Sequence, residues 1–236
     1  TALNVATALA MQGKSVIIVE LRPSFGKLAC QLHEQPARSL RSLLDLSPEQ
    51  IGHHALNSVL CKGPAEVWVL FGPKEDEDFK EIAPQQGEAI IKGLSHMAEF
   101  VILDLPSQPS AATQAAASLC HFAAVVSERE PSSVLAGKVA VKLLHKWGVK
   151  GNLAGGVVLV GSIIVNRTIY PNYTMASTEI QSQMGCEIVG IVPWGATENL
   201  HALTEGVPLV MLQPDSDPAL SSIEIANRLS TDKVVG

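Results

Sequence analysis

Acidic side chains stand at the ends of two apolar runs, at the places where strands would end. Glu20 closes the run 15–20, and Asp104 follows the apolar residues that begin at Phe100 and precedes Pro106. A carboxylate at the carboxyl end of a strand can orient the hydration shell of a magnesium ion beside a bound phosphate. An Asp in this place can equally cap a helix or belong to an ordinary loop. Position alone does not choose between these interpretations of Asp104.

Polar and aromatic side chains also follow two later apolar runs. Asn166 comes directly after the run 157–165, and its amide could pair with an adenine edge, donor to acceptor and acceptor to donor. Pro193 and Trp194 follow the run 187–192, where an indole could stack on the same base. The alternatives are an Asn that caps a turn and an ordinary surface Trp.

Several other site patterns are missing from the sequence. There is no GxxxxGK[ST] phosphate loop, no GxGxxG dinucleotide motif and no GxSxG nucleophile elbow, and the His and Cys residues show no zinc-ligand spacing. The segment most similar to a phosphate loop is Gly13-Lys14-Ser15, but Ala8 stands where the first Gly of the motif is needed. That tripeptide ends a helix and opens a strand, which is the reverse of what a phosphate cradle requires.

The elements that would position these side chains alternate between short β-branched runs and longer amphipathic segments. We expect strands at 15–20, 67–71, 100–105, 122–126, 157–165 and 187–192, and helices at 1–12, 40–46, 87–98, 110–119, 132–147, 174–184, 198–203 and 217–229. Such alternation is typical of βαβ units. The sequence therefore predicts an α/β fold of three layers, with a mostly parallel, twisted sheet and helices on both faces, in a single domain over 1–236.

Composition narrows the functional class. The 236 residues are 47% hydrophobic and 17% charged, with a formal net charge of −6, which argues against general nucleic-acid binding because that depends on Lys and Arg contacts to phosphate. No apolar stretch reaches the roughly 18 residues that a membrane span requires. The four cysteines are far apart in the sequence, as is usual for thiols of a reducing compartment, so we expect a cytoplasmic protein.

Several segments together resemble the MinD/ParA-type P-loop ATPases. Residues 1–20 (TALNVATALAMQGKSVIIVE) resemble the helix and second strand that follow the phosphate-binding loop in that family. The family's Walker B strand is similar to FVILDLP at 100–106, and further family segments are similar to IIVNR at 163–167, IVPW at 191–194, EGVPLV at 205–210 and the helix at 219–229. Within the family, FGKLA and SLRSLL in residues 21–46 look most like the CpaE-like pilus-assembly ATPases.

This resemblance implies a nucleotide site with assigned residues. It favours the metal-shell interpretation of Asp104, which would hold Mg²⁺ through water, with ATP as the nucleotide. The base and switch positions that it implies are Asn166, Arg167, Pro193 and Trp194 for the nucleotide, and Pro106, Ser107 and Gln108 for the switch region. It also implies protein partners and a homodimer. The family's first strand and phosphate loop would lie upstream of residue 1.

The chain departs from the family pattern at the end of its first strand. The family usually has Asp-x-Asp there, whereas this chain has Glu20 and Arg22, and a permanent cation cannot accept a proton. In the following loop, Ser107 replaces the second Pro of the family's usual pair, and Gln108 could orient a water or simply be exposed. These changes predict that ATP hydrolysis is weak or degenerate, with Glu20 and Asp104 as the remaining candidate catalytic residues.

Three functions are therefore considered. The first is an ATP-binding MinD/ParA-like switch or positioning protein that acts through protein partners. The second is a non-catalytic protein-interaction module on the same fold, which the Arg at position 22 favours. The third is an ATP-dependent amidoligase of the cobyrinic acid a,c-diamide synthase type, which shares the fold but usually carries an additional glutaminase domain.

Overall fold

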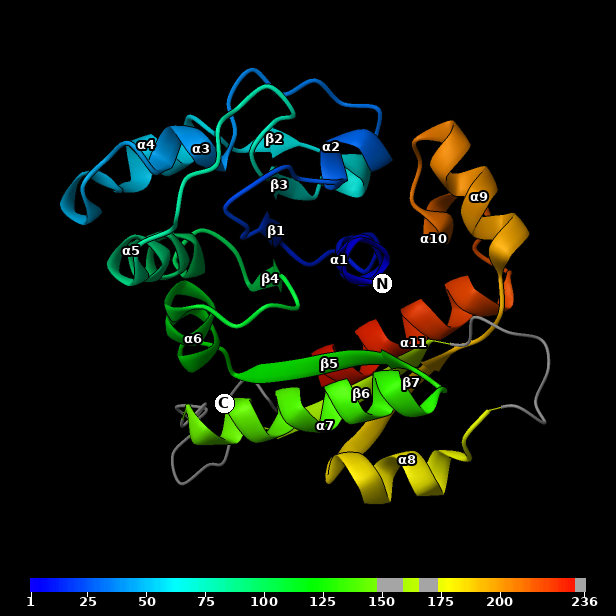
Figure 1. Ribbon diagram of the computed structural model, residues 1–236. Helices are drawn as coiled ribbons and strands as arrows, with labels where there is room; N and C mark the ends of the chain where they lie inside the picture. The colour runs from blue at the N-terminus through cyan, green and yellow to red at the C-terminus, as the bar shows by residue number, and fades with distance from the viewer. Residues whose placement is uncertain (148–158, 166–173, 232–236) are drawn as a thin grey trace. The chain divides into compact units, whose positions relative to one another are not determined.

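A computed structural model describes residues 1–147, 159–165 and 174–231 (Figure 1). The chain divides into two compact units. The first consists of Thr1–Ala116 with Leu200–Leu212, and the second of Ala117–Asn199 with Gln213–Gly236. Each unit is built around its own sheet.

The first unit contains a four-stranded sheet in the order β2-β3-β1-β4. Its strands are β1 (Val16–Glu20), β2 (Cys61–Lys62), β3 (Trp68–Leu70) and β4 (Phe100–Asp104). β1 runs parallel to both β3 and β4, whereas β2 is antiparallel to β3. All five residues of β1 are buried, as expected for a continuous apolar run between two parallel neighbours.

Helices surround this sheet, and most of them are short. The helical segments of the first unit are α1 (Ala2–Met11), α2 (Leu28–Gln31), α3 (Leu40–Leu43), η1 (Pro48–Gln50), α4 (His53–Asn57), η2 (Pro64–Glu66), α5 (Pro84–Ser95) and α10 (Leu209–Leu212). α1 packs against β1 and buries the run from Val5 to Leu9. α5 begins three residues before the predicted start, because Pro84 occupies its first turn and Gln86 accepts the N–H of Ala83.

β4 differs from β1 in burial although both strands come from continuous apolar runs. Each of its five residues is only half-buried, and its described strand neighbour is β1. A strand that is paired along one side leaves its other edge open, so its apolar side chains retain exposure. The apolar run therefore predicted the strand correctly but not its burial.

The second unit contains three parallel strands in the order β5-β6-β7. These are β5 (Phe122–Glu128), β6 (Leu159–Val165) and β7 (Glu187–Val192), joined with α7 (Pro131–Lys146), α8 (Ser177–Met184) and α11 (Asp217–Thr231). α7 packs on β5 and on α8, while α11 packs on β7. The hydrophobic core of the second unit includes Val134, Val141, Ile164, Met175, Ile180 and Met184. The division between the units falls within α6 (Ala111–Ser118) and α9 (Ala196–Glu205).

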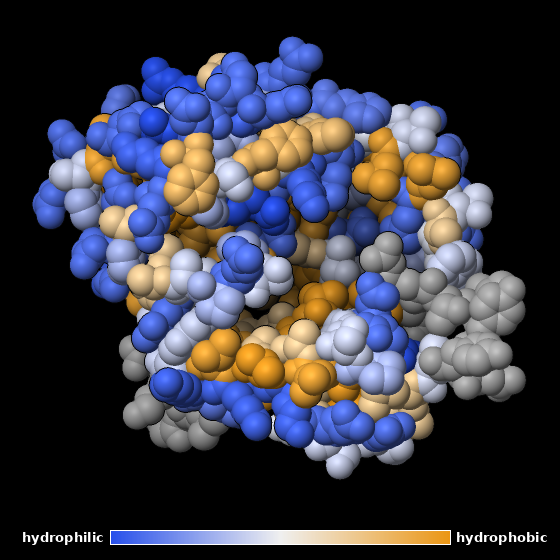
Figure 2. Space-filling view, in the orientation of Figure 1, coloured by the Kyte–Doolittle hydropathy of each residue, from blue (hydrophilic) through white to orange (hydrophobic). Residues whose placement is uncertain are grey.

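Apolar side chains of β5 and α7 reach the surface of the second unit. Val126 of β5 is 53% exposed, and Leu135 and Val139 of α7 are also exposed. Figure 2 shows apolar side chains gathered over these two elements. Among the described residues, no helix is long and apolar enough to cross a membrane.

The observed strands and helices match the predicted fold class. The parallel strands and the flanking helices follow the predicted alternation, and the strand 187–192 has the predicted bounds. The short segments α2, α4, α10 and β2 were not predicted. Four or five residues give too little periodicity to identify a helix, and two residues give too little to identify a strand.

Candidate functional site

The candidate site lies at the carboxyl ends of β1 and β4 in the first unit. Glu20 and Asp104 are the last residues of these strands, and they are direct neighbours in the parallel register. The N–H of Leu21 donates to the backbone oxygen of Asp104 over 3.1 Å, so the pairing continues one residue past β1. The ligand sites of open parallel sheets occur at such strand ends.

The Glu20 carboxylate is enclosed by the main chain. Its side chain is fully buried, and its two oxygens accept three backbone N–H groups. Lys27 donates to Oε1 over 2.6 Å, while Leu28 and Gly72 donate to Oε2 over 3.3 and 3.1 Å. These hydrogen bonds offset the cost of burying the carboxylate. This geometry connects the loop after β1 to the residue that follows β3.

Two glycines make room for that carboxylate. A Cβ atom at Gly26 would collide with Glu20 Oε2, and one at Gly72 would come within 3.0 Å of the same atom. The Gly26 N–H also donates to the oxygen of Pro73 over 2.7 Å, so the two loops run close together. The side chain at either position must therefore be hydrogen for Glu20 to reach its donors.

Arg22 joins Glu20 to Asp104. Its Nη2 donates to Asp104 Oδ2 over 2.9 Å, and its Nε lies 3.2 Å from Glu20 Oε1. The Nε contact is an ion pair without hydrogen-bond geometry, and this buried nitrogen has no hydrogen-bond partner among the described residues. The Arg22 side chain is 18% exposed and that of Asp104 is 34% exposed. Arg22 is thus held between two carboxylates and is not a solvated surface residue.

The amino end of α1 faces the same place. The Asp104 carboxylate lies within electrostatic range of the backbone nitrogen of Thr1, the residue before α1. Asp104 is therefore close to the first residue of the segment that begins α1. Helix amino ends carry free N–H groups and a partial positive charge, which favour anions.

The predicted switch residues lie in the loop that follows β4. Pro106 is half-buried, whereas Ser107 and Gln108 are exposed in a bend. Exposure agrees with the simpler interpretation of Gln108 as a loop residue, and the role of this segment as a switch stays a prediction.

The predicted base-binding residues belong to the second unit. Pro193 and Trp194 follow β7, where Pro193 is half-buried and Trp194 is 45% exposed. Asn166 and Arg167 lie outside the described residues. The adenine-binding role of all four residues therefore stays a prediction.

A magnesium ion at Asp104 would compete with Arg22 for this carboxylate, and the metal role of Asp104 stays a prediction. The Oδ2 atom of this carboxylate is already paired with Arg22, and a divalent cation there would face a like charge. The neighbouring Glu20 carboxylate is enclosed by backbone donors. Within the described part of the chain, no group of three His, Cys, Asp or Glu side chains could hold a metal.

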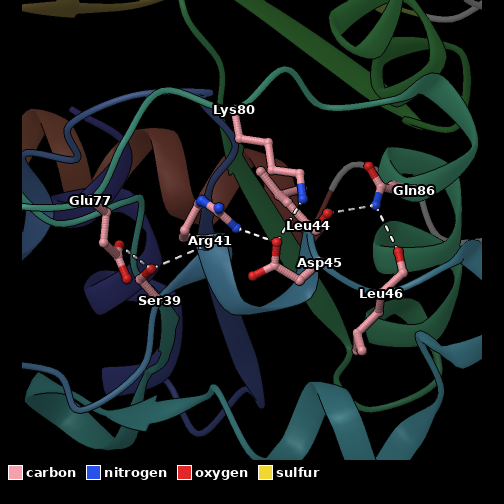
Figure 3. A network of polar contacts seen from close by, with 8 residues as sticks. All are labelled: Ser39, Arg41, Leu44, Asp45, Leu46, Glu77, Lys80 and Gln86. Atoms are coloured by element: carbon pink, nitrogen blue, oxygen red, sulfur yellow. Dashed lines mark hydrogen bonds and ion pairs between the residues drawn. The ribbon is translucent and has the colours of Figure 1, made fainter.

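A second polar network surrounds α3 in the same unit (Figure 3). The Asp45 carboxylate accepts hydrogen bonds from Arg41 and Lys80, each over 2.6 Å, and these two cations lower the pKa of Asp45 to about 2. Lys80 belongs to the acidic run 74–81, which has the sequence KEDEDFKE. The structure shows a loop that is tied to α3 by this ion pair.

Two further contacts fix that loop. Ser39, which caps α3, donates its hydroxyl to Glu77 Oε2 over 2.6 Å, and the same carboxylate oxygen accepts the N–H of Lys74. The amide of Gln86 in α5 donates to the backbone oxygens of Leu44 and Leu46 (Figure 3). This region is joined to the candidate site, because Leu40 at the start of α3 donates its N–H to the backbone oxygen of Phe71, the residue after β3.

Sequence reasoning missed two parts of the site. It identified Arg22 as a departure from the family, but not as the bridge between Glu20 and Asp104. It also passed over Gly26 and Gly72. The available signal was a glycine directly after a buried strand, which often marks a close approach of the backbone.

Comparisons with known proteins agree with this fold. No protein-family model matches the chain. It is 26% identical over 231 residues to an uncharacterized ATP-binding protein of Methanocaldococcus jannaschii, an alignment that covers 96% of this chain and 80% of that protein. It is 25% identical over 236 residues to the septum site-determining protein MinD of Bacillus subtilis, covering 99% and 84%.

Solved structures give the same result. A ParA family ATPase from Chlorobium tepidum superposes with a TM-score of 0.81 at 16% identity, over 97% of this chain and 91% of that one. MinD of Pyrococcus horikoshii, solved with Mg-ADP, gives 0.79 at 20% identity, over 100% and 90%. MinD in the MinC:MinD complex of Aquifex aeolicus gives 0.77 at 18% identity, over 97% and 88%.

The fold is therefore that of nucleotide-binding α/β proteins with parallel strands, of the P-loop ATPase class. Within this class, the chain shares its fold with solved MinD and ParA ATPases and is similar in sequence to MinD of Bacillus subtilis. The closer resemblance to the CpaE-like branch stays a prediction.

Proposed function

We propose that this protein is an ATP-binding switch or positioning protein of the MinD/ParA type that hydrolyses ATP slowly and acts through protein partners. The observation that carries the proposal is the meeting of the ends of β1 and β4 with the amino end of α1 around Asp104. Free helix N–H groups, together with Arg22, give an anion favourable contacts there. The relative from Methanocaldococcus jannaschii is described as ATP-binding, and the Pyrococcus horikoshii MinD was solved with Mg-ADP.

Slow hydrolysis follows from the state of the two carboxylates. The Glu20 oxygens are enclosed by three N–H donors, so they are not free to accept a proton from water. Asp104 is paired with Arg22. Neither carboxylate is thus available as an efficient general base, whereas nucleotide binding needs no such base.

The phosphate-binding loop is proposed to come from residues that precede Thr1. What supports this is β4, whose open edge and half-exposed apolar side chains could receive another parallel strand. A loop that leads from such a strand into α1 would end at the amino end of this helix, beside Asp104.

Protein partners and a homodimer belong to the same proposal. The Aquifex aeolicus MinD was solved in a complex with MinC. In this chain, the exposed Val126, Leu135 and Val139 form an apolar patch of the kind that protein contacts use. A non-catalytic interaction module is the second candidate, and the pairing of Asp104 with Arg22 favours it.

One experiment separates these functions. Purified full-length protein is titrated with a fluorescent ATP analogue in a magnesium buffer, and phosphate release is followed in the same samples. Arg38→Gln, an exposed residue elsewhere in the first unit, serves as the control variant. We expect saturable binding with little phosphate release in both proteins. No binding by a chain that includes a phosphate loop would reject the switch and leave the interaction module, and rapid phosphate release would contradict slow hydrolysis.

A further inference from the structure

Arg22 gives the candidate site a positive charge that belongs to the chain itself. One guanidinium lies between two carboxylates, with 2.9 Å between Arg22 Nη2 and Asp104 Oδ2 and 3.2 Å between Arg22 Nε and Glu20 Oε1. The three side chains together carry a net charge of −1, and without Arg22 this charge would be −2. Arg22 thus already supplies part of the compensation that a divalent cation would otherwise give to this pair of acids.

Arg22 also has N–H donors that its two carboxylate contacts do not use. A guanidinium has five N–H donors, and the bond to Asp104 uses one of those on Nη2. The buried Nε faces Glu20 Oε1, so the donors that a ligand could use are the remaining N–H groups on Nη1 and Nη2, and the side chain retains 18% exposure. A planar guanidinium binds phosphate oxygens in pairs, which an ammonium group cannot do.

The surroundings of Arg22 fit an anion better than a second cation. The amino end of α1 lies near Asp104 and contributes a partial positive charge. The Glu20 oxygens accept backbone N–H groups and Oε1 also faces Arg22, so this carboxylate holds the guanidinium in place without offering a free oxygen. A phosphoryl group that reached Arg22 would meet donors on both sides.

We propose that the Arg22 guanidinium pairs with Asp104 in the position that a divalent metal would otherwise take, and that it also binds the nucleotide phosphates. Nucleotide binding to this site therefore does not require Mg²⁺. This inference rests on the proposed function, because it concerns how the same site holds its nucleotide. It differs from a purely structural role for Arg22, in which removing the guanidinium would alter stability but not the metal dependence of binding.

The test measures the dissociation constant of a fluorescent ADP analogue in EDTA and in Mg²⁺. The full-length protein is compared with Arg22→Gln, which removes the charge, and Arg22→Lys, which keeps the charge but loses the planar donor pair. Arg38→Gln is the exposed control, and circular dichroism verifies that each variant is folded. ADP is used because it isolates binding from hydrolysis.

The expected result has three parts. The unaltered protein and the control bind the analogue equally well, within about twofold, in EDTA and in Mg²⁺. Arg22→Gln binds at least about tenfold more weakly in EDTA and recovers part of this loss in Mg²⁺, since the two carboxylates now attract the metal. Arg22→Lys binds several-fold more weakly in both buffers but remains independent of Mg²⁺.

Other outcomes would overturn the proposal. Loss of binding by the unaltered protein in EDTA would show that a metal is required, and an unchanged Arg22→Gln would show that Arg22 does not touch the phosphates. If no protein binds the analogue in either buffer, the proposed function itself fails. Thermal denaturation then tests whether Arg22 replaces a metal. Mg²⁺ should raise the midpoint of unfolding of Arg22→Gln, but not that of the unaltered protein or of the double variant Arg22→Gln/Asp104→Asn. If Mg²⁺ does not raise the midpoint of Arg22→Gln, the proposal that Arg22 replaces a metal is overturned.

Discussion

β1 and β4 lie side by side in one sheet, and both consist of four apolar residues followed by an acid. β1 has a parallel neighbour on each side, and all of its residues are buried. β4 has a described neighbour on one side, and all of its residues are half-buried. Two nearly equivalent sequences thus occupy different environments because of their places in the sheet.

This difference separates the roles of the two terminal acids. Glu20, at the end of the central strand, is fully buried and holds the loops together through backbone N–H groups. Asp104, at the end of the edge strand, keeps 34% exposure and one ion pair. The carboxylate with more protein contacts is therefore the structural one, and the more accessible carboxylate is the one that a ligand can reach.

Removing the charge of Glu20 should have the largest effect on stability. Glu20→Gln replaces one acceptor oxygen by a donor that faces N–H groups, and leaves Arg22 without its buried partner. We expect a loss of about 3–5 kcal/mol in the free energy of unfolding, measured by urea denaturation. The control Glu88→Gln, which breaks only an exposed pair with Lys92, should cost less than about 1 kcal/mol. Equal losses would mean that Glu20 is not an anchor.

A matched pair of truncations tests the burial difference directly. Ile18 and Ile102 face each other in the register of β1 and β4, but Ile18 is fully buried and Ile102 is half-buried. Ile18→Ala should cost about 4 kcal/mol and Ile102→Ala about 2 kcal/mol in urea denaturation of the chain 1–236. In a longer protein where another strand covers β4, the two losses should become equal. A persistent difference there would argue against a strand at this edge.

Asp104→Asn should affect stability less than either change in β1. The substitution removes the charge that pairs with Arg22, but both side chains retain contact with water. We expect a loss of about 1 kcal/mol, again from urea denaturation, because partly exposed ion pairs contribute little. A loss as large as that of Glu20→Gln would show that the two acids share one structural role.

The smallest effect is expected at Asp45, outside the strand pair. Hydrogen bonds from Arg41 and Lys80 lower its pKa from 3.8 to about 2. Since the folded pKa lies below the unfolded one, the contribution of the ion pair is fully present above about pH 4 and is lost as the pH falls through about 2. Asp45→Asn should therefore be less stable than the unaltered protein at about pH 5, and the difference should shrink as the pH falls through about 2. An NMR titration that places the Asp45 carboxyl near 3.8 would contradict the ion pair.

The fold could be predicted largely because its strands are continuous apolar runs. The runs at 15–20, 100–105 and 187–192 correspond to β1, β4 and β7, and the helices between them follow from amphipathic periodicity. Their burial could not be predicted, because an edge strand and a central strand can have the same sequence pattern. That property depends on how many neighbours each strand acquires in the sheet.

The candidate site could be predicted only in part. Asp104 was identified because an acid follows an apolar run, and Glu20 because it stands where the resembled family has an Asp; the structure brings the two together. The bridge through Arg22 and the donors from Lys27 and Gly72 depend on loops that join distant parts of the chain. No local pattern encodes such a contact, since the partners are separated by up to 82 residues in sequence.

The enclosure of Glu20 has a consequence for amide hydrogen exchange. The N–H groups of Lys27 and Gly72 lie in loops, where exchange with solvent is normally fast. Here their acceptor is a fully buried side chain of the central strand, so these hydrogens can be released only when Glu20 leaves its position. Exchange at these two loop amides should therefore be as slow as exchange at the amides of β1 itself. Although both amides lie outside the sheet, their exchange rate would measure how often the sheet opens.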